Sequence, residues 1–320
     1  MGFFKPLSSD QAARHLTRYF QQLKAKKPDR PLQAAVSAPK LGLNFTFPSD
    51  STSQPYHIAS IGKMFTAVLI QRLAAGGAFS IQDPIHPFFV PAELERLFVF
   101  QGADHARQVT IEHLLGHTSG IADYVEGRTL DGRVFLKDVL ANPRTRWTPQ
   151  ALLDFTRSRQ QAVGAPGQVF NYSDTGYVLL GLLIEKVTGR SFAENLHAHF
   201  FTPLGMHDTY LMFYSKAASQ PQKEIQPIWM NQQEVSRFES LSCDWAGGGV
   251  ISTTADLIKF NRALRAGELI GLDVVESMDR CPHKFQPGIY YGLGMMEIRF
   301  KDFFFLLGGL PRVRGPDVRT

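Results

Sequence analysis

Ser60 and Lys63 are the first side chains in this sequence whose types and spacing could do chemistry. They precede an apolar run, Met64 to Leu73, whose spacing predicts a buried helix beginning near Ser60. On one helix face, a hydroxyl beside an amine at the positive helix end is a candidate nucleophile, because the amine can accept its proton. A Ser-x-x-Lys tetrapeptide is also frequent by chance, and such a serine is usually a helix cap. The pair therefore needs partners elsewhere.

Tyr172 and Asp174 form a second candidate pair, just before the apolar run Val178 to Ile184. In an extended loop their side chains point the same way, because side chains alternate. A phenol near an ammonium can have a lowered pKa and act as a base, and Asp174 could orient Lys63 or hydrogen-bond a substrate. The structural alternative is that Tyr172 fills the core and Asp174 caps the following helix.

Two histidines, His113 and His117, have the helical spacing of metal ligands, but Leu114 stands where the H-E-x-x-H motif has its acid. We therefore expect no metal site and a structural role for His117 in a turn-rich loop. The sequence also lacks a phosphate-binding loop and a G-x-S-x-G elbow, so we expect no cofactor.

The composition is that of a globular protein, with 320 residues, 44% hydrophobic and 20% charged. The net charge of +5 comes from scattered basic residues, which argues against a nucleic-acid partner. Cys243 and Cys281 occur in no CxxC pattern and fit reduced thiols better than a disulfide framework. The sequence shows no secretory signal and no apolar run of membrane length, so we expect a cytoplasmic protein with no membrane partner.

Strand patterns occupy both ends of the chain, and helical patterns occupy its centre. The predicted helices are 9–27, 110–115, 148–157 and 175–188, and the predicted strands are 32–36, 43–47, 249–252 and 289–307. This order predicts an α+β protein. Residues 1–85 and 241–320 would form a discontinuous α/β domain, residues 86–240 an inserted helical domain, and the cleft would lie between them.

Together these stretches resemble the serine β-lactamase-like hydrolases, which include class C β-lactamases, penicillin-binding proteins and family VIII carboxylesterases. The matching motifs, in family order, are Ser60-x-x-Lys63, Leu114-Leu-x-His-Thr-Ser-Gly120, Pro166-Gly-x-x-Phe-x-Tyr-Ser-Asp174, Pro203-Leu-Gly-Met206, Gly247-Gly-Gly-x-x-Ser-Thr253 and Tyr291-Gly-Leu-Gly294. The resemblance implies the β-lactamase/DD-peptidase-like fold, an antiparallel sheet flanked by helices with an inserted all-helical domain.

The resemblance also implies roles for the candidate residues. Ser60 would attack an acyl carbonyl, Lys63 and Tyr172 would transfer the proton, and water would release the acyl-enzyme. Whether Lys63 or Tyr172 is the acylation base stays open. The family usually has Asn where this chain has Asp174, and a negative charge there would raise the pKa of Lys63 and make it a poorer base.

A complete member of this family carries a third motif, His-x-Gly or Lys-Thr-Gly, on a strand that lines the cleft, followed by a last strand and a helix. Here either Leu306-Leu307-Gly308 occupies the motif without its polar residue, or the motif was due just after Gly315, which we prefer. We therefore expect a chain truncated or frame-shifted near Gly315. Loss of an oxyanion donor would then impair its activity.

The expected function is that of a serine hydrolase acting on a small-molecule ester, amide or lactam. A carboxylesterase is the first expectation. A D-aminopeptidase, a DD-peptidase or a weak β-lactamase is the second. A catalytically impaired scaffold or binding protein of the same fold is the alternative from another class. The sequence predicts no oligomeric state.

Overall fold

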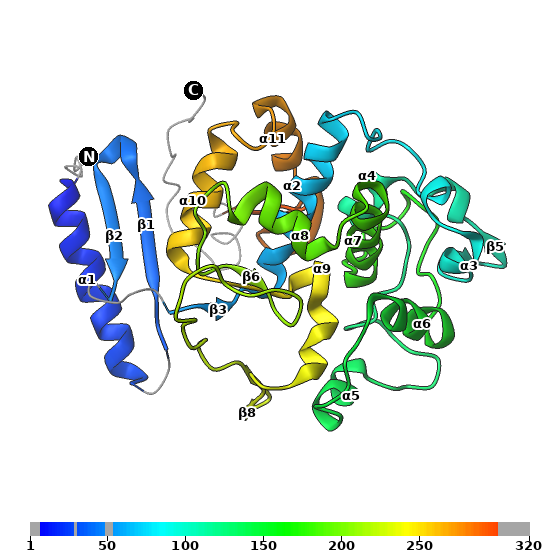
Figure 1. Ribbon diagram of the computed structural model, residues 1–320, viewed down its shortest axis with the longest axis horizontal. Helices are drawn as coiled ribbons and strands as arrows, with labels where there is room; N and C mark the ends of the chain where they lie inside the picture. The colour runs from blue at the N-terminus through cyan, green and yellow to red at the C-terminus, as the bar shows by residue number, and fades with distance from the viewer. Residues whose placement is uncertain (1–6, 29–30, 49–53, 300–320) are drawn as a thin grey trace, which may run out of the picture.

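The computed structural model describes residues 7–28, 31–48 and 54–299, arranged as in Figure 1. The helices in this part of the chain are α1 (Ser9–Lys26), α2 (Gly62–Ala75), α3 (Pro91–Leu94), α4 (Ile111–Leu115), α5 (Phe135–Ala141), α6 (Pro149–Arg159), α7 (Asp174–Thr188), α8 (Phe192–Leu196), α9 (Trp245–Gly248), α10 (Thr254–Arg265) and α11 (Leu272–Asp279). The strands are β1 (Ala34–Ala38), β2 (Leu43–Phe47), β3 (Tyr56–His57), β4 (Val99–Phe100), β5 (Ala103–Asp104), β6 (Tyr210–Leu211), β7 (Trp229–Met230), β8 (Gln233–Glu234), β9 (Val250–Ser252), β10 (His283–Gln286), β11 (Ile289–Tyr291) and β12 (Met296–Ile298).

The predicted helices at 9–27, 110–115, 148–157 and 175–188 are confirmed as α1, α4, α6 and α7, and the helix expected near Ser60 is α2. The strands expected near 32–36, 43–47 and 249–252 are confirmed as β1, β2 and β9. The late strand signal corresponds to β11 and β12. Residues 300–320, on which the prediction about the third motif falls, lie outside the described residues.

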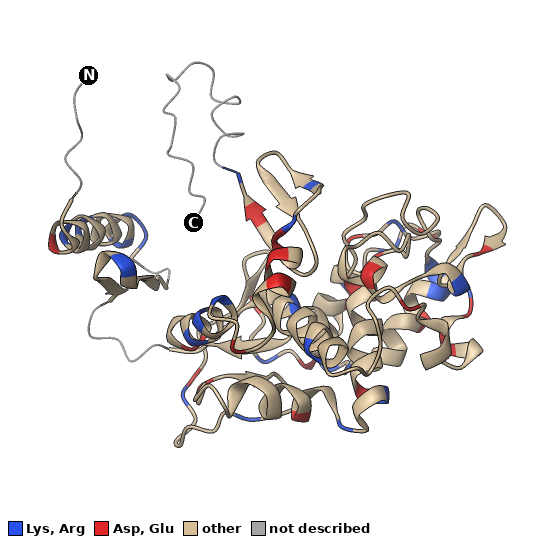
Figure 2. Ribbon diagram, turned by 90° about the horizontal axis from the view of Figure 1, so that it is seen from above, with Lys and Arg blue, Asp and Glu red and all other residues tan. Residues whose placement is uncertain are grey.

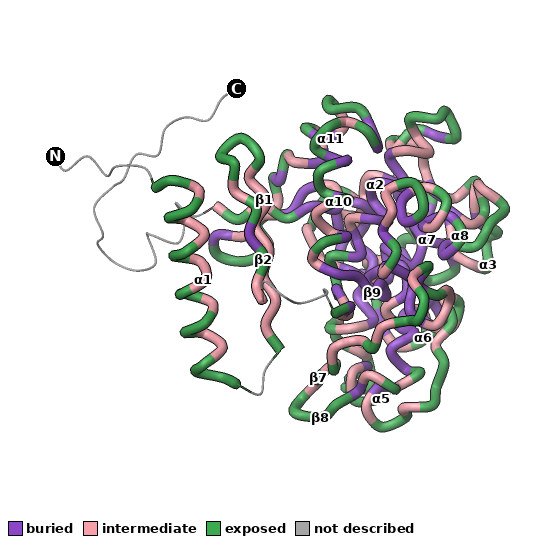
Figure 3. Tube along the Cα trace, turned by 60° about the vertical axis from the view of Figure 1, so that its left-hand side comes forward, coloured by how far each residue is buried: buried purple, intermediate pink, exposed green. Residues whose placement is uncertain are grey.

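The core is built around α2 and α7, which are buried almost all round, as their continuous apolar sequences require. Figure 3 shows buried residues concentrated around these helices, α10 and β9, while α1 carries no buried residue. Phe65 of α2 packs on Phe260 of α10 with ring centroids 4.1 Å apart. The helix with the nucleophile candidate is therefore an internal element.

Two small antiparallel sheets flank this core. β9 lies between β3 and β6, with Ile251 opposite both His57 and Tyr210. β11 lies between β10 and β12. The first sheet holds the segment before Ser60 beside the glycine-rich segment around α9, although the two are far apart in sequence.

The central region of the chain is mostly helical, but it also contains the hairpins β4–β5 and β7–β8, which the sequence did not predict. It also supplies β6 to the sheet of β3 and β9. Two-residue strands are too short to show an alternating pattern. The fold is mixed α+β as predicted, and the division at residues 85 and 240 stays a prediction.

Charged residues of both signs are interspersed over the elements in Figure 2. Both cysteines are free and buried. In the described part of the chain, every helix is too short or too polar to cross a membrane, and its His, Cys, Asp and Glu side chains form no cluster of three that could hold a metal ion.

Gly62 gives a test of how α2 is placed. A Cβ on Gly62 would lie 2.9 Å from the Cα of Gly248, so this crossing of α2 and α9 requires bare backbones. We expect Gly62→Ala to lower the free energy of unfolding by about 1–3 kcal/mol, despite the better helix propensity of alanine. Thermal unfolding of the folded protein measures this.

Gly76→Ala is the matched control at the other end of α2. A Cβ there would meet its nearest neighbour, a carbonyl oxygen, at 3.4 Å, which is ordinary contact. Equal stability of the two variants would contradict the close-approach argument.

Candidate active site

Ser60 lies in the single turn Ala59–Ile61, between β3 and α2. Ala59 has a left-handed backbone with φ of 47°, which is costly for a residue with a Cβ. A Cβ on Gly248 would lie 2.9 Å from the carbonyl carbon of Ala59, so the glycine permits the close contact that holds this turn. The result is an exposed Ser60 hydroxyl above a buried helix start.

Lys63 is one turn further along and is only 1% exposed. Its Nζ donates hydrogen bonds to Ser60 Oγ at 3.3 Å, Asp174 Oδ1 at 2.5 Å and the Gly247 carbonyl at 2.8 Å. Burial by itself would lower the pKa of Lys63, but the Asp174 carboxylate and then Tyr172 outweigh it, so the net pKa lies well above its usual value. The lysine is therefore an ammonium in the resting protein, in the direction expected from Asp174.

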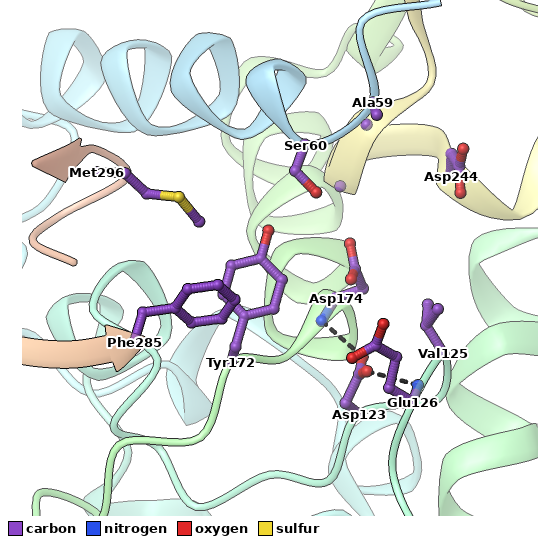
Figure 4. Close-up of a pocket in the computed structure, with 12 residues that line it drawn as sticks. Ala59, Ser60, Asp123, Val125, Glu126, Tyr172, Asp174, Asp244, Phe285 and Met296 are labelled. Atoms are coloured by element: carbon purple, nitrogen blue, oxygen red, sulfur yellow. Dashed lines mark hydrogen bonds between the residues drawn. The ribbon is translucent and has the colours of Figure 1, made fainter. Parts of the chain in front are cut away.

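Tyr172 closes the site from the loop before α7. Its ring centroid lies 4.8 Å from Lys63 Nζ, and its hydroxyl points toward Ser60 in Figure 4. The buried hydroxyl has no hydrogen-bond partner of good geometry among the described residues, although Lys63 and Ser60 both favour its ionisation. Burial is the larger effect and raises the pKa of Tyr172, so the resting side chain is a neutral phenol.

Asp174 is the first residue of α7, and Ser173 is its N-cap, with a side chain that accepts from the Gly176 amide. Asp174 therefore does not take the capping role considered above, and its carboxylate is free to pair with Lys63. The structure brings Ser60, Lys63, Tyr172 and Asp174 together at one place, and the roles expected for them stay predictions.

His117 contacts the loop that carries Tyr172. Its Nδ1 accepts the backbone N–H of Ser173 at 3.0 Å, and its ring packs on Tyr172 with centroids 4.3 Å apart. The side chain is buried, and burial followed by the Lys63 charge holds its pKa well below the usual value. A neutral imidazole that fixes the loop of Tyr172 matches the structural role expected for it.

Sequence reasoning missed Asp123, a second carboxylate beside Asp174. Asp123 Oδ1 accepts the backbone N–H of Asp174 at 2.9 Å, and Oδ2 accepts that of Glu126 at 2.8 Å. Burial, then the charge of Asp174, raises the pKa of Asp123 to about 6. The one available signal was its place three residues after the His-Thr-Ser-Gly motif, since periodicity says nothing about a loop.

Ser60, Asp123, Tyr172 and Asp174 line one cavity of about 360 Å³, and Lys63 and His117 lie behind its wall. Figure 4 shows an apolar side, with Phe285 and Met296, and an acidic side. The carboxylates on the acidic side are Asp123, Glu126, Asp174 and Asp244. Asp244 is also paired with a histidine, because its Oδ2 lies 3.3 Å from His57 Nε2. Only one of the four carboxylates pairs with Lys63, so the cavity favours a cationic group in its ligand.

Comparison with known proteins agrees with this geometry. A family model described as Beta-lactamase matches residues 51–295. The chain belongs to the Beta-lactamase family. The match contains every residue that lines the cavity except Met296, which directly follows it.

Relatives within this family have several activities in their names. Penicillin-binding protein 4* of Bacillus subtilis (strain 168) is 28% identical over 247 residues, 71% of this chain and 48% of that protein. A D-stereospecific amidohydrolase from Streptomyces sp. has a similar structure, with a TM-score of 0.65 and 28% identity over 79% of this chain and 74% of that one. D-amino acid amidase from Ochrobactrum anthropi SV3 gives a TM-score of 0.62 and 26% identity over 78% and 69%. This chain spans about half the length of the curated relatives it matches.

The arrangement is suited to acyl transfer. An exposed hydroxyl at a helix start can attack a carbonyl carbon, and a buried ammonium and a phenol beside it can exchange protons with the attacking and leaving groups. The fold and the family are thus those of a serine hydrolase.

Asp123 gives a test of the site's electrostatics through stability. Its pKa is raised from 3.8 to about 6, so the folded protein holds this proton more tightly than the unfolded chain does. The stabilising contribution is therefore complete below pH 3.8 and lost as the pH rises through about 6. Between pH 3.8 and about pH 6, the free energy of unfolding of the wild type should therefore fall by up to about 3 kcal/mol relative to that of Asp123→Asn.

Chemical denaturation of both proteins at pH 4.5 and pH 7 measures this difference. The variant should be less stable than the wild type at pH 4.5, because an amide nitrogen replaces one of two acceptor oxygens. The difference between the two free energies of unfolding should be smaller at pH 7. A gap that stays constant or widens with pH would contradict the prediction.

Proposed function

We propose that this protein is a carboxylesterase that works through an acyl-Ser60 intermediate. The observation that carries the proposal is the contact between Ser60 Oγ and Lys63 Nζ inside a cavity that Tyr172 also lines. Lys63 first gives up one proton, Ser60 Oγ attacks the ester carbonyl as its own proton passes to Lys63, and the alkoxide departs with a proton supplied by Lys63 or Tyr172. Water then repeats the sequence and frees the acid.

The state of Lys63 favours esters over amides. An ammonium held by Asp174 has no lone pair for the Ser60 proton until it gives up a proton of its own, so the attacking hydroxyl receives limited help. An ester's alkoxide departs more readily than an amide's amine, which must be protonated as it leaves. A weakly activated serine therefore discriminates in favour of esters.

A second candidate is hydrolysis of amides whose acyl group carries a free amine. The acidic side of the cavity supports it, since an ammonium on the acyl group would face Glu126 and Asp244 while its side chain contacts Phe285 and Met296. The names of two structural neighbours, a D-stereospecific amidohydrolase and a D-amino acid amidase, support it as well. A D-aminopeptidase activity falls within this candidate. A DD-peptidase or weak β-lactamase activity, a location in the cytoplasm and impairment by loss of the third motif stay predictions.

Covalent labelling tests the shared mechanism. We expect a fluorophosphonate probe to label the folded wild type at Ser60, and Ser60→Ala to remove the label entirely, because the probe reacts only with an activated hydroxyl. Peptide mass spectrometry identifies the modified residue. Ser80→Ala, at an exposed position outside the cavity, is the control and should leave labelling unchanged.

Absence of label on Ser60 in folded protein would favour the scaffold alternative. If Ser60 is labelled, hydrolysis of p-nitrophenyl butyrate compared with nitrocefin separates an esterase from a β-lactamase.

The acidic side of the cavity predicts the acyl group. We expect alanine p-nitrophenyl ester, with its free amine, to have at least tenfold higher kcat/KM than its N-acetyl counterpart, because the carboxylates attract the ammonium. Glu126→Gln should reduce this ratio about threefold, and added salt should reduce it further because Glu126 is exposed. Glu276→Gln, at an exposed position of α11, is the control. A ratio near one in the wild type would contradict the cationic preference.

A further inference from the structure

The surroundings of Lys63 leave it no free hydrogen. An ammonium has three N–H groups, and three acceptors surround Nζ: Ser60 Oγ, Asp174 Oδ1 and the Gly247 carbonyl. The shortest of these contacts, at 2.5 Å, is to Asp174. Nζ therefore has no lone pair directed at Ser60 in the resting protein.

Neither candidate base can accept the Ser60 proton in this state. Lys63 is charged, and its pKa is raised by Asp174 and Tyr172 against the effect of burial. Tyr172 is a phenol whose pKa is raised by burial. The Asp174 carboxylate is in direct contact with Nζ and is therefore the nearest acceptor for a proton of Lys63.

We propose that Asp174 is the final acceptor of the Ser60 proton and receives it through Lys63. The inference rests on the proposed function, since it needs Ser60 to be the nucleophile. It makes Asp174 a positioning residue that acts through Lys63 and sets the protonation state of the lysine.

The proton balance closes over one acylation. Lys63 Nζ gives one proton to Asp174 Oδ1 and rotates about its Cε–Nζ bond, so that its lone pair faces Ser60. The Ser60 O–H bond then breaks, its proton goes to Nζ, and Oγ bonds to the acyl carbon while the carbonyl oxygen becomes an oxyanion. When the tetrahedral species collapses, the leaving group takes a proton from Lys63, which recovers one from Asp174. The Lys63–Asp174 pair then returns to its starting charge.

The neighbours of the pair favour a neutral Asp174 during this transfer. Asp123 contacts the Asp174 backbone, and Asp244 lies in the same cavity, so a proton on Asp174 relieves repulsion between carboxylates. The other titratable groups that interact with the pair are Tyr124, Tyr172, Tyr177, Cys243 and Tyr291, together with the neutral His117. Burial raises the pKa of the phenols and the thiol, so they stay uncharged at neutral pH.

Asp174→Asn tests the proposal, because it keeps the shape of the side chain and removes its negative charge and its ability to accept a proton. The readout is the second-order rate of fluorophosphonate labelling at Ser60 from pH 6 to pH 10. The wild type should react at a level rate from pH 7 to pH 9. The variant should react at least tenfold more slowly at pH 6 and recover as the pH approaches the pKa of Lys63, which burial lowers once the Asp174 charge is gone.

A variant that reacts at pH 6 as fast as the wild type, or faster, would overturn the proposal, since Asp174 would then only keep Lys63 charged. Should Asp174→Asn fail to fold, the wild-type profile decides alone. A level rate supports the proposal, and a tenfold rise per pH unit from pH 7 to pH 10 overturns it, because the base would then be neutral Lys63.

Asp208→Asn is the matched control. It removes a carboxylate 2.6 Å from Lys223, outside the cavity, and should leave the pH profile unchanged. Failure of the proposed function is a separate result: the wild type would then carry no label on Ser60 at any pH.

Discussion

The buried ammonium of Lys63 constrains the rest of this structure. Lys63 is only 1% exposed. A buried ammonium is tolerated only where each of its N–H groups donates a hydrogen bond and an opposite charge lies beside it. Those conditions bring together three segments: the start of α2, the start of α7 and the glycine-rich segment at α9, which supply the hydroxyl, the carboxylate and the carbonyl. The same contacts that make Lys63 tolerable in the core therefore assemble the site.

Close packing of bare backbone is the second requirement. Gly62 and Gly248 let α2 and α9 approach so closely that a Cβ on either one would meet backbone atoms at 2.9 Å. A Cβ on Gly247 would lie 2.3 Å from Asp174 Oδ1. Larger residues in this segment would therefore move Lys63 away from its partners. This close packing explains why residues 247–249 are all glycine.

The sequence predicts the parts of this site that are encoded locally. Ser60 and Lys63 are three residues apart at a helix start, and Tyr172 and Asp174 stand next to another, so spacing makes all four candidates, and the resemblance to the serine β-lactamase-like hydrolases implies their roles. Asp123 and Asp244 could not be found in this way, because 29 acidic residues are spread along the chain and only tertiary packing selects these two. The sequence also does not predict the two-residue strands β3 and β6. They are strands because they pair with β9, and two residues show no alternating pattern of their own.

The aspartate at position 174 connects stability with chemistry. An asparagine at position 174 could hydrogen-bond Lys63 but would add no charge to the site. The aspartate instead holds Lys63 protonated, and its negative charge repels that of Asp123. That repulsion disfavours the resting charges and is relieved whenever a proton reaches the carboxylates. The carboxylate of Asp123 therefore reduces the free-energy difference between the charged and the neutral forms of the Lys63–Asp174 pair. In an isolated pair this difference would be larger. This proximity is what a proton path through Lys63 requires, and it explains how a buried, fully hydrogen-bonded lysine can still take part in acyl transfer.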